Sequence, residues 1–439
     1  MRNSILSSAL SVSMEGLDDG QMDEINPVTA ETVLQLDQTL EDVRDTGATV
    51  DQADDAVEEL SDAAASMEAM IVSLESFIAG GGMSPQTAHM HSVGMANAVR
   101  RLPISAGEFV VSTESFGGTG DKLQASMEAL EGAKALLAKI WEGIKNAITS
   151  AWDALKSFFA SIGKSGPAVV AAGQSLKKRA IAQKGQAAVV FNASIWSGKA
   201  LQTLIVDGKA DPVGALAAIN TGYTVGVEQY TNKVLAQLNP LYAAVQQGAV
   251  TPERLKEAAS KIDLKACLSK SMKGELPGGY YFDMKVSDEY LNGGTDLAVL
   301  SKSKMSFERD ASKDVKSAPQ APMSVDIIAS IADEVIKMGQ LMIKSKGVAA
   351  AAEKGMQAAV KAGNSLVGKG DTLSKEEQNA SKGILAQLNK AARLCSGCSH
   401  QYLSYMGTSA KTAVSFCSQA LKAYGKGDAK AKKDEAAQA

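Results

Sequence analysis

The sequence predicts a mainly α-helical protein: an elongated helical bundle body with a small inserted antiparallel β-sheet, preceded by an acidic helical N-terminal arm. Three observations predict this fold class. Aromatic residues make up only 5% of the 439 residues, prolines number 10 and alanine is abundant, a composition that favours helices over an all-β sandwich. Apolar residues recur at helical spacing over most of the chain. Alternation of apolar and polar residues between glycine pairs is confined to residues 278–307.

The acidic arm, residues 1–114, is expected to contain one long helix over residues 27–79. Its apolar residues follow i, i+3, i+4 spacing, and Asp and Glu fill the opposite face. Three consecutive glycines end this helix at residues 80–82. Ser84, followed by Pro85, is expected to start a short second helix, because proline is favoured in the first helical turn.

A junction separates the arm from the rest of the chain. Residues 107–111 read as extended, and residues 117–120 form a glycine-rich hinge, so we expect an exposed segment open to proteases. Beyond the hinge, residues 123–162 form a pronounced amphipathic helix with two Trp, two Phe and several Lys. This helix fits a protein core, and it also fits a membrane interface or a docking surface.

The remaining elements are expected to be helical apart from one sheet. Helices are predicted at residues 167–206, 212–247, 251–262, 324–346, 347–368 and 374–424. Two or three antiparallel strands over residues 278–307 interrupt them. The chain thus divides into an acidic arm, an amphipathic helical region, a β insertion, a C-terminal helical region and a Lys/Ala-rich disordered tail. These are residues 1–114, 115–270, 271–310, 311–424 and 425–439.

Charge changes sign at residue 114. The whole protein has a net charge of −4, but residues 1–114 hold 20 acidic residues, four basic residues and no Lys, a net charge of −16. The rest of the chain therefore has a net charge of +12, carried mainly by Lys. Such an asymmetry favours a polyanionic partner for the basic part. Lys suits nonspecific neutralisation of phosphates, whereas scarce Arg argues against readout of base edges.

Composition also argues against several classes of protein. No run of 18 apolar residues is present in the sequence, so no spanning helix is expected. Four cysteines are too few for a disulfide scaffold of this size, which favours a reducing compartment. The first residues imitate a signal peptide, but serine interrupts their apolar stretch, and we expect no export.

No catalytic, cofactor or metal site is expected. His89 and His91 are interpreted as a loop pair, since no carboxylate or Cys adjoins them. Cys395 and Cys398 are predicted to be buried on one face of the C-terminal helix, because a structural zinc site needs a second pair of ligands. The glycine-rich pieces lack the Lys-Ser/Thr of a phosphate loop.

The tripeptide Ser-x-Glu clusters near the charge boundary. It occurs five times in the first 128 residues and three times in the remaining 311. The early copies end at Glu15, Glu68, Glu75, Glu114 and Glu128, and an Ala-Gly-Glu variant ends at Glu108. Similar composition is common at helix starts in acidic chains. The coincidence of this cluster with the charge boundary favours a functional interpretation.

Together, the charge organisation and the tripeptide resemble those of the internal head proteins and related capsid components of phiKZ-like giant tailed phages. In that family a prohead protease cuts after the Glu of a small-x-Glu motif, which removes acidic propeptides and leaves Lys-rich proteins with the genome. The resemblance implies that Ser112, Thr113 and Glu114 form the principal cleavage motif of a propeptide-like arm. It also implies further cuts in the released propeptide after Glu15, Glu68, Glu75 and Glu108, with Glu128 as an alternative end of the propeptide.

The resemblance also implies partners and a location. The partners are the prohead protease, capsid or scaffold proteins, and packaged double-stranded DNA bound without sequence preference. The protein is expected in the cytoplasm of the bacterial host during assembly and in the capsid interior of the finished virion. A membrane-active virion or secreted protein acting through residues 123–162 is the alternative, and salt-resistant binding to vesicles would favour it. An enzyme is the least favoured class, which only a pocket with converging polar groups near residues 280–307 would support.

Overall fold

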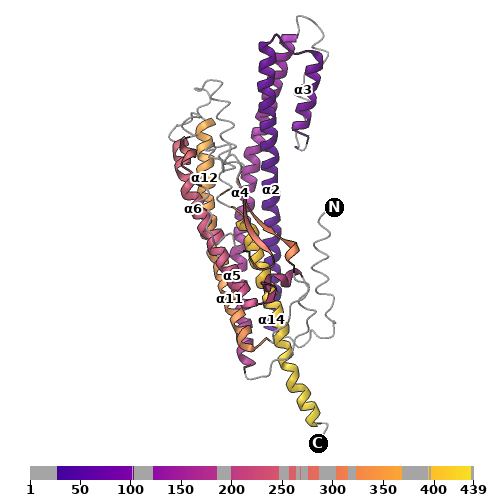
Figure 1. The fold of residues 1–439 in the computed structure, drawn as a ribbon, viewed down its shortest axis with the longest axis vertical. Coiled ribbons are helices and arrows are strands. Elements are labelled where there is room, and N and C mark those ends of the chain that lie inside the picture. Colours follow the sequence, from indigo (N-terminus) through magenta and orange to yellow (C-terminus); the bar gives the residue numbers. More distant parts are fainter. Residues whose placement is uncertain are drawn as a thin grey trace.

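A computed structural model shows an elongated, mainly helical molecule (Figure 1). It describes residues 27–100, 102, 122–184, 199–246, 257–263, 267, 275–285, 303–314, 323–367, 394 and 397–436. The α-helices are α2 (Pro27–Ala79), α3 (Pro85–Ala98), α4 (Lys122–Ala182), α5 (Pro212–Tyr223), α6 (Tyr230–Gln246), α11 (Val325–Lys344), α12 (Lys346–Val367) and α14 (Ser399–Ala436). A π-helical segment, η6 (Thr224–Gln229), joins α5 to α6, and two short 3₁₀ helices are η5 (Lys199–Leu204) and η8 (Ala311–Lys313). The expected mainly α fold is confirmed.

The longest helices, α2 and α4, lie side by side and antiparallel along much of the molecule, and α3 folds back beside α2 (Figure 1). α4 is longer than the sequence predicted, because it passes through Pro167 instead of ending before it. The proline removes one backbone hydrogen bond from the helix. Ile162, Ala168 and Val169 are buried on both sides of it, so tertiary contacts hold the helix continuous where local propensity predicted a break.

The other long helices pack around the hairpin formed by α2 and α4. α11 packs along α4, α14 lies against α2, α4 and α5, and α12 packs against α6 (Figure 1). The predicted helix at residues 251–262 lies partly outside the described residues. The predicted pair of helices at residues 324–346 and 347–368 is confirmed as α11 and α12.

The predicted antiparallel insertion is confirmed as two strands, β3 (Tyr280–Lys285) and β4 (Lys304–Arg309), with Tyr280 opposite Arg309. The candidate third strand near residue 298 falls outside the described residues. Aromatic side chains hold this sheet against α14. The ring of Phe282 stacks on Tyr402 at 5.1 Å, and that of Tyr280 lies 4.5 Å from Tyr405.

A second small sheet was not predicted. β1 (Ile205–Val206) and β2 (Lys209–Ala210) form a hairpin where the sequence analysis expected the end of a helix over residues 167–206. Its two turn residues, Asp207 and Gly208, have φ angles of 48° and 74°. Asp-Gly is favoured in a two-residue hairpin turn that needs positive φ at both positions. The signal was therefore present in the sequence.

The C-terminal helix differs from its prediction at both ends. α14 begins at Ser399, just after Gly397, whose φ of 51° interrupts the helix expected over residues 374–424. Residues 368–393 lie outside the described part of the chain. α14 then continues to Ala436, so most of the tail predicted to be disordered is helical. Ala and Lys are strong helix formers, and their propensity extends the helix without apolar periodicity.

Among the described residues, α2 and α4 share two cores of buried apolar side chains. The larger core joins the first half of α2, the second half of α4, α5, α11 and α14. The smaller core joins the second half of α2, α3 and the first half of α4. Both cores therefore depend on the contact between α2 and α4, since these two helices supply residues to each of them.

We expect Gly339→Ala to destabilise the protein by about 1–3 kcal/mol, because α4 and α11 touch backbone to backbone there. A Cβ atom at Gly339 would lie 2.8 Å from both the carbonyl oxygen of Gly166 and the amide nitrogen of Val170. Urea unfolding followed by helical circular dichroism measures the loss. Gly347→Ala is the control: its Cβ would meet no atom within 4 Å, so stability should stay equal or rise slightly. Equal stability of both variants would contradict the close contact.

Candidate functional site

α2 carries most of the acidic residues of the N-terminal arm, and it packs along α4 through a contact of apolar side chains. Buried residues of α2 recur every seven positions, and a second row three residues later becomes apolar in the second half of the helix. The first row is Leu36, Val43, Val50, Val57, Ala64 and Ile71, and the second is Leu60, Met67 and Leu74. This pattern is typical of a coiled coil. We call the buried face between the two helices the α2–α4 seam.

Polar side chains within the seam fix its register. In the first half of α2 the second row holds Thr39 and Thr46 in place of large apolar residues. The hydroxyl oxygens of Thr46 and Ser161 lie 2.8 Å apart, and Ser165 donates a hydrogen bond of 2.9 Å to the carbonyl oxygen of Thr39. Ser161 and Ser165 are buried. Because these groups meet in only one alignment, they specify how the helices pair.

Two exposed ion pairs join α2 to neighbouring helices near its two ends. Lys134 Nζ lies 3.1 Å from Glu75 Oε1 at one end of the seam. Lys411 Nζ on α14 lies 3.1 Å from Asp37 Oδ1 at the other end, without the geometry of a hydrogen bond. These four side chains are 33–47% exposed, so water screens both pairs and each contributes little to stability. The buried apolar face of α2 contributes more than either of these pairs.

Asp51 makes a more protected contact in the middle of α2. Its Oδ1 accepts a hydrogen bond of 2.8 Å from Nε2 of His400, a side chain only 7% exposed whose ring edge meets Phe158. Burial raises the pKa of the Asp51 carboxyl, but the hydrogen bond and the charge of His400 outweigh burial and leave that pKa below its usual value. Gln401 and Lys304 lower it further. The contact ties α2 to the first turn of α14.

The outer face of α2 is acidic and exposed. Within Pro27–Ala79 there are 13 acidic residues and one basic residue, Arg44. Most of the acidic side chains point away from the seam. The exposed ones include Glu41, Asp42, Asp45, Asp55, Glu58 and Glu59. The acidic segment thus presents its charge to solvent instead of covering the lysines of the body.

The residues predicted as cleavage positions fall into two groups. Ser112, Thr113, Glu114, Glu15 and Glu108 lie outside the described residues. Within the described part, Glu68 and Glu75 lie in α2 and Glu128 lies in α4. Glu75 and Glu128 are exposed, and Glu68 is half-buried. All three are held in regular helix, so the structure does not bring them together.

The histidines and cysteines form no reactive cluster in the described chain. His89 and His91 lie on the helix α3, not in a loop, because Ser84 caps that helix and Pro85 starts it. The ring of His91 packs against Phe77, and burial lowers its pKa. Cys398 is buried as predicted, but it lies in the turn before α14 and not on the helix; burial raises its pKa to about 12. Cys395 lies outside the described residues, which contain no group of three or more His, Cys, Asp or Glu placed to hold a metal.

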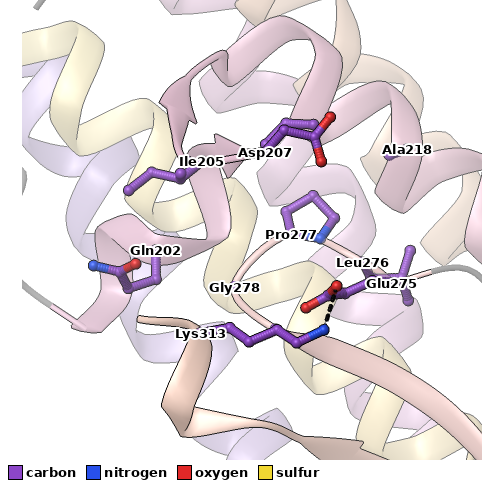
Figure 2. Close-up of a pocket in the computed structure, with 12 residues that line it drawn as sticks. Gln202, Ile205, Asp207, Ala218, Glu275, Leu276, Pro277, Gly278 and Lys313 are labelled. Carbon is purple, nitrogen blue, oxygen red and sulfur yellow. Dashed lines mark hydrogen bonds and ion pairs between the residues drawn. The ribbon is translucent and has the colours of Figure 1, made fainter. Parts of the chain in front are cut away.

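A pocket of about 220 Å³ lies between the β1–β2 turn and the turn that precedes β3 (Figure 2). Asp207 lines one side of it and Glu275 the other. Lys313 Nζ lies 2.6 Å from Glu275 Oε2, so these two charges neutralise each other. The remaining walls are apolar or backbone, apart from Gln202. The arrangement offers no nucleophile next to a base, and none of these residues was predicted as a site residue.

Comparison with known proteins decides the family. Residues 35–419 match the phiKZ-like phage internal head proteins, and this region includes most of α2, all of α4 and the greater part of α14. The chain belongs to this family. No curated protein and no solved structure matches it. An internal head protein is a structural component of the virion in the capsid interior, as the resemblance implied.

The amphipathic stretch at residues 123–162 lies within α4, where its apolar face fills the seam of this internal head protein. Ile140, Ile144, Phe158 and Ile162 are each at most 1% exposed. This face is therefore a core face in the folded chain, not a free surface for a lipid interface. None of the described helices is both long and apolar enough to cross a membrane.

We expect Asp51→Asn to lower the free energy of unfolding at pH 7, because it removes the negative charge that faces His400. The loss should be at most about 1 kcal/mol, since Asp51 is half-exposed and water screens the contact. A carboxyl whose pKa is lower in the folded protein stabilises it above the unfolded pKa, and this contribution disappears as pH falls through the folded pKa. The difference between wild type and variant should therefore shrink below about pH 4. Urea unfolding from pH 7 to pH 3 measures it.

Asp55→Asn is the control, since Asp55 is exposed on the same helix. It should change stability little at any of these pH values. If Asp51→Asn and Asp55→Asn had the same effect, the contact between Asp51 and His400 would not stabilise the fold.

Proposed function

We propose that this internal head protein enters the capsid with an acidic N-terminal segment that a prohead protease removes after Glu114. The Lys-rich body then packs with the genome as a nonspecific neutraliser of phosphate charge. The charge boundary at residue 114 supports this proposal, because the chain on either side has a net charge of −16 and +12. The motif Ser112, Thr113 and Glu114 stands at that boundary.

The exposed acidic face of α2 is the observation that best supports this order of events. α2 lies directly beside α4, whose exposed lysines include Lys134, Lys156 and Lys164. The carboxylates of α2 act on other charges within about one Debye length, which is roughly 8 Å at physiological salt. Much of the neighbouring surface of α4 falls within this range. The acidic face of α2 therefore repels a DNA phosphate from the same side. While α2 is in place, the body binds DNA weakly.

Docking to a capsid or scaffold protein during assembly is a second part of the proposal. The acidic outer face of α2 suits a basic partner surface, and long-range attraction would speed the encounter. Removing the segment would end that attraction. Because the cut peptide bond does not re-form, the protein could not return to its state before incorporation.

The cut predicts a new N-terminus at Ser115 in mature particles. Mass spectrometry of peptides from purified virions should find peptides that begin at Ser115, and Glu114→Gln should abolish them because the protease needs the carboxylate. Glu142→Gln is the matched control, since its Ile-Trp-Glu context lacks the small residue. Abundant virion peptides that span Glu114 and Ser115 intact would contradict the proposal.

Charge neutralisation on α2 should strengthen DNA binding by the full chain. We expect the triple variant Glu41→Gln, Glu58→Gln, Glu59→Gln to bind duplex DNA severalfold more tightly than wild type, because all three side chains are exposed and make local negative potential. Binding measured by fluorescence anisotropy should fall steeply with salt for both proteins and should not depend on DNA sequence. The full chain is used because α2 belongs to both cores.

The control changes the same net charge elsewhere, with Glu128→Gln, Glu131→Gln and Glu142→Gln on α4, all exposed. A smaller gain is expected from it. An equal gain in both variants would show that net charge alone matters, and no gain in either would indicate that the asymmetry serves docking to protein instead.

A further inference from the structure

We propose that the N-terminal segment stays bound to the body as a separate chain after the backbone is cut between α3 and α4. A cut at that point would then not uncover the basic body by itself. Release would need a second event that breaks up α2. This inference rests on the proposed function for the cut itself, but its structural basis is the α2–α4 seam.

The seam buries large apolar side chains along nearly the whole of α2. Eight of them are at most 9% exposed: Leu36, Val43, Val50, Val57, Leu60, Met67, Ile71 and Leu74. They are divided between the two cores, so α2 is held at both ends and not at one anchor point. A helix held in this way does not depend on its covalent link to α4 for its place.

α3 remains with α2 after such a cut and adds contacts of its own. Met83, just before α3, is buried, and its amide donates a hydrogen bond of 2.9 Å to the hydroxyl of Ser126 on α4. Ala88 and Met95 of α3 are buried in the smaller core. None of the seam contacts described here passes through residues 103–121, so a cut there removes none of them.

Retention of α2 by apolar contacts should depend on salt differently from retention by ion pairs. Beside the seam, α2 also makes the half-exposed pairs Glu75–Lys134 with α4 and Asp37–Lys411 with α14, which salt screens. Burial of apolar surface does not weaken as salt rises. The acidic segment should therefore stay in place at salt concentrations that abolish DNA binding.

The positions of Glu68 and Glu75 indicate what the second event is. Both lie inside α2, so a protease that binds an extended strand reaches them only after α2 unwinds locally. Glu75 is one turn from the end of α2 at Ala79, where unwinding is easiest. A cut after Glu75 separates α3 and its buried side chains from α2, and a cut after Glu68 also separates Ile71 and Leu74 from the rest of the seam.

The test places a recognition sequence for a site-specific protease between α3 and α4 of the full chain. The purified protein is cut and passed over a size-exclusion column in 0.15 M and in 1 M NaCl. We expect both fragments to elute together at the volume of the uncut protein in both salts, with unchanged helical circular dichroism. Separation of the fragments at either salt concentration would overturn the proposal.

Two alanine variants test whether the seam is responsible. Leu74→Ala removes a fully buried side chain of α2, and Val72→Ala removes one that is 67% exposed two residues away. In the cut protein, Leu74→Ala should shorten the half-life of the complex at least about tenfold, whereas Val72→Ala should leave it unchanged. Circular dichroism of the uncut variants confirms that both fold. Equal half-lives of the two cut variants would contradict the seam as the holding force.

This experiment separates the inference from the proposed maturation. The engineered site replaces the prohead protease, so its outcome does not depend on where the virion protein is cut. Absence of a new N-terminus at Ser115 in virions would refute the proposed maturation and leave retention standing. Separation of the engineered fragments would refute retention and leave the cut at Glu114 standing.

Discussion

The apolar seam between α2 and α4 is the contact on which the rest of the structure depends. α4 has one face against α2 and another against α11, and both cores draw on it. Taking α2 away would expose side chains such as Ile140 and Phe158, which are fully buried. A segment that the charge pattern marks as separate is therefore an integral part of the folded molecule.

Two forces of different range act on the same helix. Apolar burial acts only at contact and fixes α2 in its place along α4, whereas its carboxylates act over several ångströms through solvent. The apolar face and the acidic face point in opposite directions, so neither interferes with the other. A helix with these properties can be held firmly by the body and still keep a polyanion away from it.

Buried hydrogen bonds between segments distant in the sequence join the other helices of the bundle. Tyr402 on α14 donates a hydrogen bond of 2.6 Å to the carbonyl oxygen of Ile219, and Tyr405 donates one of 2.7 Å to that of Pro277. These buried hydroxyls join α14 to α5 and to the turn before β3. Their role is structural, because both hydroxyls are buried and bond to main-chain carbonyls.

The sequence by itself determined the helical faces, the charge boundary and the β3–β4 pairing, because periodicity, charge and turn residues are local properties. It did not determine what covers the apolar face of residues 123–162, for which a core, a membrane and a docking surface all remained open. It also missed the contact between Asp51 and His400, which lie 349 residues apart in the chain. Tertiary structure decided these points, because a local pattern shows that a face must be buried but only contacts between distant segments determine its partner.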